Sequence, residues 1–250
     1  MTLSQRELER YSRQLLMPEW TGEAQDRLKS SSALVVGAGA LGSPAATYLV
    51  AAGIGRLGVV DGDTVELSNL HRQPLHMTPD VGARKAEVAA AKLGLLNPEV
   101  LVEPYPVALD ETNAEAIVTG ADVVLDCTDS FESRYLVNAA CCSVGVALVE
   151  AGVVGFEGLV LSIRPGESAC YRCVFPEPPP PGTRRTCRDQ GVLGAMAGIV
   201  GSIQALEALK LLGEVGEPLL GRLLQLDGWS MAHTLVATER RRGCAACAPE

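Results

Sequence analysis

Four of the eight cysteines fall into two pairs that share the spacing C-x-x-C. Cys170 and Cys173 form the first pair, and Cys244 and Cys247 form the second pair more than seventy residues later. Two such pairs suit a tetrahedral zinc site, which needs four thiolates and leaves no position open for a substrate. We therefore predict a structural Zn²⁺ site that fixes the C-terminal tail; the alternative is four unrelated thiols.

A further cysteine, Cys187, stands beyond four consecutive prolines at 178–181. Arg184, Arg185 and Arg188 surround it, and positive charge favours the thiolate, which is the reactive form of cysteine. The prolines predict an extended segment that packs neither as a helix nor as a central strand. We interpret Cys187 as a candidate nucleophile on a mobile loop; the alternative is an exposed thiol that is only sensitive to oxidation.

A glycine-rich loop, G-x-G-x-x-G, follows the first apolar strand and precedes a helix. It is formed by Gly37, Gly39 and Gly42, and Asp61 ends the next strand, 19 residues beyond the last glycine. Such glycines allow a tight turn and let phosphates approach the N-terminus of the helix, while the acidic residue can bind ribose hydroxyls. The spacing predicts a nucleotide site but does not choose among NAD, FAD and ATP.

Charged residues that follow the strands favour a triphosphate. Asp63, Asn69 and Arg72 lie just past the second strand, and Lys85 comes soon afterwards in a predicted helix that begins at Thr78. Asp126 and Asp129 follow a later strand. Because the carboxyl ends of parallel strands meet at one crevice, cations and carboxylates should gather there. Cations neutralise a polyphosphate and carboxylates can hold Mg²⁺, whereas hydride transfer needs neither.

The pattern of apolar runs predicts the elements that position these groups. A parallel sheet built of right-handed βαβ units is expected, with strands at 33–36, 57–60, 100–105, 123–125 and 147–150. Helices are expected at 4–16, 21–29, 41–52, 78–94 and 131–143. After Gly152, strand-like runs at 158–163 and 221–226 flank a long apolar helix over 192–212.

This long helix resembles a membrane span by length, but Gln204, Glu207 and Lys210 interrupt it, so we expect a buried core helix. Small residues at 194, 198 and 202 recur every four positions and predict close approach of another helix, either in the core or across a dimer interface. The fold class that follows is α/β: a Rossmann-like, doubly wound mixed sheet, parallel in its N-terminal half and partly antiparallel in its C-terminal half, with a Cys₄ zinc knuckle.

The composition argues against a nucleic-acid partner and against a signal peptide. The formal net charge of −9 over 250 residues argues against a nucleic-acid partner. The first 29 residues are polar and charged, without the apolar core of a signal peptide, so we expect a cytoplasmic protein with no membrane association. We expect one domain over 1–250, made of N-terminal helices (1–30), a nucleotide-binding half (31–152) and a second half (153–250) that carries the cysteines.

Several motifs together resemble the ThiF/MoeB/HesA family, the bacterial relatives of ubiquitin-activating enzymes. They are, in chain order, RYSRQ, GAGALG, VDGDTVELSNLHRQ, VGARKAE, DCTDS, CYRC, TCRDQGV and CAAC, and they span nearly the whole chain. The resemblance implies an adenylyltransferase that uses ATP and Mg²⁺ to adenylate the C-terminal glycine of a small ubiquitin-like sulfur carrier. The second half, 153–250, would bind that carrier and contain a crossover loop.

The resemblance also implies roles for residues. Arg72 and Lys85 would hold phosphates, helped by Asn69, while Asp129 would bind magnesium and Asp61 the ribose. The implied ATP-binding set also contains the loop and its flanks: Gly37, Gly39, Ala40, Gly42, Asp63, Ser68 and Ser130. Ala40 replaces a glycine and Ser130 replaces an asparagine of many members, which puts the contact of Ser130 with ATP in doubt.

Two further implied residues act outside this set. Arg13 matches an arginine that reaches into the partner subunit's site in family dimers, which implies a homodimer. Cys187 matches a cysteine that joins covalently to the carrier in some members. Sulfur would come from a separate protein, a cysteine desulfurase or a rhodanese. Two alternatives stay open: an NAD-dependent oxidoreductase, and a non-catalytic zinc scaffold that binds a ubiquitin-like protein.

Overall fold

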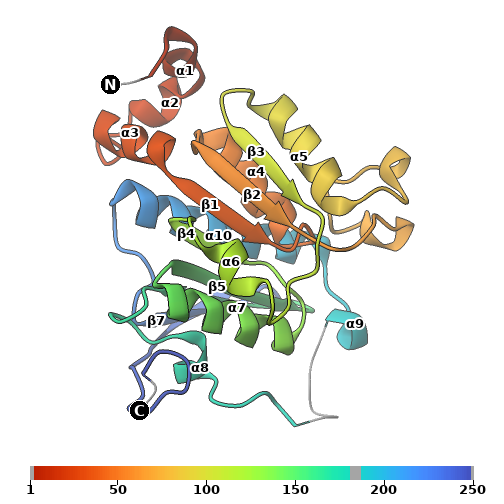
Figure 1. The fold of residues 1–250 in the computed structure, drawn as a ribbon, viewed down its shortest axis with the longest axis vertical. Coiled ribbons are helices and arrows are strands. Elements are labelled where there is room, and N and C mark those ends of the chain that lie inside the picture. Colours follow the sequence, from red (N-terminus) through yellow and green to blue (C-terminus); the bar gives the residue numbers. More distant parts are fainter. Residues whose placement is uncertain (1–2, 181–186, 249–250) are drawn as a thin grey trace.

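The computed structural model describes residues 3–180 and 187–248, except for the side chains at 187 and 188 (Figure 1). Eight strands form one sheet in the order β3-β2-β1-β4-β5-β6-β7-β8. The strands that pair in parallel are β1 (Ser32–Val36), β2 (Arg56–Val60), β3 (Leu101–Tyr105), β4 (Val123–Asp126) and β5 (Ala147–Val154). The antiparallel strands are β6 (Glu157–Ile163), β7 (Arg222–Asp227) and β8 (Ala232–Ala237). The predicted fold class is confirmed.

Helices cover both faces of the sheet, as a doubly wound fold requires. One apolar core lies between the sheet and α3 (Gly22–Ser30), α4 (Gly42–Ala52), α5 (Lys85–Leu96) and α10 (Gly194–Gly213). The other core lies against α6 (Ala114–Val118), α7 (Phe131–Val144) and the short helix α8 (Tyr171–Val174), with α8 beside the C-terminal tail (Figure 1).

The predicted N-terminal helix is divided in two. α1 (Gln5–Arg10) begins with a capping box between Ser4 and Glu7, and α2 (Ser12–Leu15) follows after Tyr11. Tyr11 is buried, and its hydroxyl accepts a hydrogen bond of 2.9 Å from the Asn97 side chain. The helix is therefore interrupted at Tyr11, the residue whose side chain is anchored in the interior.

The helix expected to begin at Thr78 begins instead at Lys85. Thr78–Asp80 forms only the 3₁₀ turn η2, and Gly82 then adopts a left-handed φ of 92° that no helix continues through. Residues 82–84 pair with the loop that follows β2. Val65 forms backbone hydrogen bonds with residues 82 and 83, and Thr64 forms an isolated β-bridge with Arg84. This pairing places Lys85 at the first position of α5 instead of one turn inside it.

α10 is the one helix in the described part of the chain that is long and apolar enough to cross a membrane. It packs across the sheet against α4, β5 and β6, as expected of a core helix. Gln204 donates hydrogen bonds to the carbonyl oxygens of Asp126 and Val149, at 2.7 and 3.0 Å. Glu207 accepts from the Ser162 hydroxyl at 2.7 Å. The polar residues of the apolar run therefore tie the helix to the strands.

Within this chain, the small residues at 194, 198 and 202 do not form the close contact between α10 and α4, and a contact of this stripe across a dimer interface stays a prediction. A Cβ on Gly198 would meet nothing within 4 Å, whereas one on Gly201 would lie 2.4 Å from the Leu41 carbonyl oxygen and 2.6 Å from a Pro44 carbon. Gly201 is therefore the residue that allows α10 to approach α4. The close approach of α10 to α4 therefore occurs at a residue outside the predicted stripe.

We expect Gly201→Ala to lower the free energy of unfolding by about 2 kcal/mol, because the added methyl group must push α10 away from α4. The matched change Gly198→Ala lies in the same helix without such a contact. It should raise stability by roughly 0.5–1 kcal/mol, since alanine loses less backbone entropy than glycine. Urea unfolding of the two variants checks this prediction, and equal midpoints would contradict it.

Candidate active site

The glycine loop is tight because two of its glycines leave no room for a side chain. Gly37 has a φ of 99°, and a Cβ there would lie 2.9 Å from the Cys127 carbonyl oxygen at the end of β4. A Cβ on Gly42 would lie 1.8 Å from the Gly37 carbonyl oxygen. At Gly39 the nearest atom would be 3.6 Å away. Packing within the chain does not require glycine at 39, which suits close approach of a ligand.

Asp61 joins this loop to the end of β2. Its carboxylate accepts hydrogen bonds from the backbone N–H groups of Ala38 and Asp63, each at 2.8 Å. A carboxylate oxygen can accept more than one hydrogen bond, so ribose hydroxyls can bind beside these contacts. The side chain predicted to bind ribose therefore also fixes the backbone on which the nucleotide would lie.

Lys85 points back toward the same edge of the sheet. Its side chain is 8% exposed, and Nζ lies 3.0 Å from a carboxylate oxygen of Asp63. The backbone N–H of Lys85 also donates to the Asp63 carbonyl oxygen at 3.0 Å. Lys85 and Asp63, both predicted to bind ATP, are thus in direct contact. The backbone pairing just before α5 brings the buried charge of Lys85 to the ends of the strands.

The segment between β2 and α5 carries Arg72, Asn69 and Ser68. Asn69 ends the 3₁₀ helix η1 (Leu67–Asn69), is buried, and accepts through its side chain from the Glu66 N–H at 3.2 Å. Arg72 donates to the Ser68 carbonyl oxygen at 2.9 Å. The start of α10 lies against this segment, because a Cβ on Gly194 would be 3.1 Å from the Arg72 Cα.

Beneath the loop, His76 is 3% exposed, and its Nε2 lies 2.9 Å from the Ala38 carbonyl oxygen. Nδ1 is buried without a hydrogen-bond partner in the described part of the chain. Nε2 therefore carries the proton and donates it, and the ring is neutral. Burial lowers the pKa of His76, and the charges of Lys85 and Lys92 lower it further.

This geometry predicts a pH dependence of stability. Below about pH 6.5, the ordinary histidine pKa, the unfolded chain binds a proton that buried His76 does not. The stabilisation from His76 is fully present above that pH and is lost as the pH falls toward its lowered folded value. We expect His76→Gln to remove about 1–2 kcal/mol of the stability difference between pH 7 and pH 5. The matched change at exposed His233 should leave that difference unaltered in urea unfolding.

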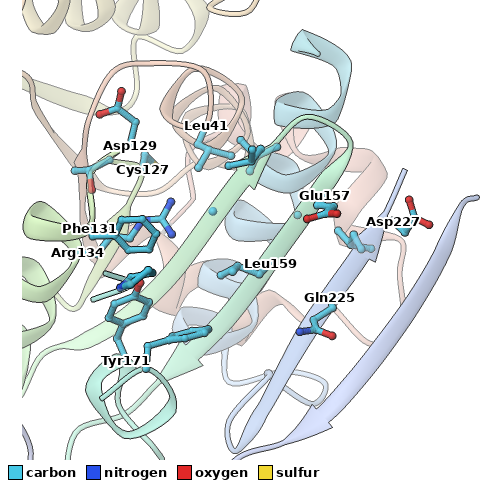
Figure 2. A pocket seen from close by; sticks show the side chains of 18 of the residues that line it. Leu41, Cys127, Asp129, Phe131, Arg134, Glu157, Leu159, Tyr171, Gln225 and Asp227 are labelled. Atoms are coloured by element: carbon cyan, nitrogen blue, oxygen red, sulfur yellow. The ribbon is translucent and has the colours of Figure 1, made fainter. Parts of the chain in front are cut away.

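Asp129 and Ser130 follow β4. Ser130 caps α7: its hydroxyl accepts from the Ser133 N–H at 3.0 Å. Asp129 lines a cavity of ≈ 710 Å³ together with Leu41 and Cys127, next to the glycine loop (Figure 2). The cavity extends from there across β5 and β6 to aromatic side chains of α7 and α8. A nucleotide on the loop would therefore lie at one end of this cavity.

Of the remaining predicted catalytic residues, Arg13 lies away from the site within this chain, and the position of the Cys187 side chain stays untested. Arg13 is exposed on α2, and its neighbour Gln14 donates to the Ala52 carbonyl oxygen at the C-terminal end of α4. The glycine loop lies at the opposite end of that helix. Cys187 begins the short helix α9 (Cys187–Gln190), but its side chain lies outside the described residues, as do Arg184 and Arg185.

The four paired cysteines lie together. Their Sγ atoms are all within 4.8 Å of one another, with separations of 3.8 Å for Cys170–Cys173, 3.7 Å for Cys170–Cys244 and 3.5 Å for Cys173–Cys247. Tetrahedral zinc with Zn–S bonds of about 2.3 Å places sulfur atoms about 3.8 Å apart. None of the four is in a disulfide. Their geometry is compatible with zinc.

Most residues of the cavity wall lie outside the predicted site, and Arg134 is a charged residue among them. Arg134, on α7, projects into the cavity beside the Phe131 ring (Figure 2). It lies four residues beyond the DCTDS motif, which contains Asp129 and ends at Ser130, and only a count of one helical turn from the start of α7 indicates that it faces the same space.

These features define a class: α/β proteins with a Rossmann-like glycine loop, a cavity beside it and a separate cluster of four cysteines. The model of the ThiF family matches residues 11–246, and the chain belongs to this family. The chain is 48% identical over 247 residues to the SAMP-activating enzyme E1 of Haloferax volcanii, covering 99% of this chain and 91% of that one.

Other comparisons agree. The chain is 46% identical to the sulfur carrier protein adenylyltransferase of Thermus thermophilus, covering 100% of this chain and 94% of that one. It is 48% identical to mouse adenylyltransferase and sulfurtransferase MOCS3, covering 98% of this chain and 54% of that protein. The crystal structure of E. coli MccB superposes with a TM-score of 0.86 over 100% of this chain and 74% of that one, at 23% identity, which shows the shared fold.

Proposed function

We propose that this protein adenylates the C-terminal glycine of a small ubiquitin-like sulfur carrier with ATP. The observation that supports the proposal is that two features lie side by side. The glycine loop, with the buried side chain of Lys85 nearby, adjoins the end of the cavity at Asp129. The names of the two relatives that match over nearly their whole length, an activating enzyme E1 and a sulfur carrier protein adenylyltransferase, support the same reaction.

In the proposed reaction, a carboxylate oxygen of the carrier's last glycine attacks the α-phosphorus of ATP. The P–O bond to the β-phosphate breaks, and pyrophosphate leaves with that electron pair. Both reactants are anionic, so preplaced cations are needed to stabilise the transition state. Lys85 and Arg72 would contact the phosphates, Asn69 and Ser68 would support them, and Asp61 would bind the ribose.

Mg²⁺ would supply further neutralisation of the phosphates. Asp129 suits it, because a carboxylate is the ligand class that Mg²⁺ prefers and this one faces the cavity end next to the loop. Asp61 and Asp63 are the other carboxylates near the loop: Asp61 accepts hydrogen bonds from the backbone, and Asp63 contacts Lys85. We propose that Asp129 holds the ion and that Asp63 keeps Lys85 in place until the nucleotide binds.

The remaining parts of the proposal concern partners. The carrier's Gly-Gly tail would enter the cavity over β5 and β6, and Arg13 would complete the site from the second subunit of a homodimer. Cys187 would form a covalent adduct with the carrier, and a separate cysteine desulfurase or rhodanese would supply sulfur. We propose a cytoplasmic enzyme that acts without nucleic acid or membrane. The pathway could be thiamin, molybdopterin or tRNA thiolation.

Carrier-dependent exchange of labelled pyrophosphate into ATP tests the proposal. We expect exchange with a Gly-Gly-ending carrier and none when the last two glycines are removed. An oxidoreductase would instead reduce or oxidise a nicotinamide cofactor and show no exchange. A zinc scaffold would bind the carrier without exchange. Absence of exchange with every ThiS-type and MoaD-type carrier would falsify adenylation.

A further inference from the structure

Arg134 is one of the residues that line the cavity. Its side chain is 11% exposed, and the guanidinium carbon lies 5.9 Å from the centre of the Phe131 ring (Figure 2). The backbone makes room for it at Gly152 in β5, where a Cβ would lie 2.5 Å from Nη1 and 2.8 Å from Nη2. The fork of the guanidinium thus lies against the strand over which the cavity passes.

Two buried carboxyl groups stand behind this guanidinium. Asp126 and Glu150 are both fully buried, and Nε of Arg134 lies 3.5 Å from a carboxyl oxygen of Glu150. Burial raises the pKa of Asp126, and burial together with the charge of Asp126 raises that of Glu150. Burial opposes the charge on Arg134, but the negative charges of Glu150 and Asp126 raise its pKa. The contact with Glu150, with Asp126 beside it, therefore fixes the position of the guanidinium.

The ion pair with Glu150 holds Arg134 in place, but several polar atoms of the three side chains form no hydrogen bond within the described residues. Nε of Arg134, one oxygen of Asp126 and both oxygens of Glu150 are buried without a hydrogen-bond partner in the described part of the chain. Nε faces Glu150 in this ion pair, so the groups that remain for a ligand are the two Nη nitrogens, which lie against Gly152 at the cavity wall. The adenylation scheme above assigns no role to any of these three residues.

A Gly-Gly tail has no side chains, so an enzyme can recognise it only through main-chain N–H and C=O groups and through the narrowness of its channel. A guanidinium offers five N–H donors in a planar fork and can serve two acceptors at once. The walls around Arg134 are aromatic, formed in part by Tyr171 and Phe175. Apolar walls strengthen a hydrogen bond from a charged donor.

We propose that Arg134 binds the carbonyl oxygens of the carrier's C-terminal glycine segment, and that Asp126 and Glu150 are positioning residues that hold its guanidinium toward the cavity. This inference rests on the proposed function, since it names the group that holds the substrate of the same site. Arg134 would orient the tail so that its terminal carboxylate reaches the nucleotide end of the cavity at Asp129.

Calorimetric binding of a MoaD-type carrier, with and without its last two glycines, tests the inference in the absence of ATP. The intact carrier should bind the unmodified enzyme more tightly than the truncated one. Arg134→Ala should weaken binding of the intact carrier by roughly ten- to a hundredfold, the usual range for hydrogen bonds to a charged group. Its affinity for the truncated carrier should stay the same.

Arg134→Lys keeps the charge beside Asp126 and Glu150 but loses the fork, so it should fold and still weaken tail binding. Arg172→Ala is the matched control: this arginine lies 5.0 Å from the Tyr135 ring on α7 and does not line the cavity. It should keep the full difference between the two carriers. In exchange assays, the Arg134 variants should raise the KM for carrier and leave the KM for ATP unchanged.

The outcomes separate this inference from the proposed function. If exchange occurs and the Arg134 variants bind the intact carrier as tightly as the unmodified enzyme does, the role of Arg134 is overturned and adenylation stands. If no exchange occurs but binding depends on both the glycines and Arg134, adenylation is overturned and the tail site stands. Equal affinity of the unmodified enzyme for both carriers overturns the tail site.

Discussion

Lys85→Ala is expected to reduce pyrophosphate exchange by about a hundred- to a thousandfold, the usual effect of removing one preorganised group from a transition state that develops charge. Lys85 is the first residue of α5. Its side chain is nearly buried, and its Nζ lies 3.0 Å from a carboxylate oxygen of Asp63. A cation placed before the nucleotide binds needs no reorganisation during the reaction. The loss should therefore fall more on kcat than on the KM for ATP.

Lys92→Ala is the matched control for this variant. Lys92 lies two turns further along α5, where its Nζ contacts Asp80 and donates to the Leu75 carbonyl oxygen at 3.0 Å. Removing it changes the same net charge on the same helix, away from the strand ends. We expect exchange by Lys92→Ala within about threefold of the unmodified enzyme, as for a change outside the site. Equal losses in the two variants would contradict a phosphate-binding role for Lys85.

The position of Lys85 also shows where prediction from the sequence reached its limit. The strands and the glycine loop are local patterns: apolar runs bounded by turn residues, and glycines at fixed spacing. The start of α5 is not local, because Thr78 and Pro79 form a good helix start that the chain does not continue. Pairing of 82–84 with the loop after β2 decides where α5 begins, and that pairing joins segments that no periodicity connects.

The same distinction holds for the long strands and the cavity. β5 was predicted to end at Glu150 and extends to Val154, and β8 was not predicted, because both depend on pairing with an antiparallel neighbour. Gly152 lies beyond the predicted strand, but in the sheet it is the position that admits Arg134. The helical turn indicates which way Arg134 faces, whereas the strand that passes beneath it follows only from the pairing of β5 and β6.

Removing one ligand of the cysteine cluster should have the largest effect on stability. We expect Cys170→Ser to abolish the binding of one Zn²⁺ per chain and to lower the free energy of unfolding by about 3 kcal/mol or more, since metal-binding energy in such sites is folding energy. Cys170 is fully buried and lies within 4 Å of both Cys173 and Cys244. Zinc analysis of the purified protein and urea unfolding measure the two effects.

Loss of the zinc site should also disturb the wall of the cavity. The residue after Cys170, Tyr171, donates its N–H to the Asn138 side chain of α7 at 2.8 Å, and its ring forms part of the cavity wall. Loosening the cluster should therefore raise the KM for carrier more than the KM for ATP. Cys141→Ala, at a buried cysteine of α7 outside the cluster, should cost only about 1 kcal/mol and keep the zinc. Full zinc content in Cys170→Ser, or none in the unmodified protein after supply of Zn²⁺, would contradict a Cys₄ site.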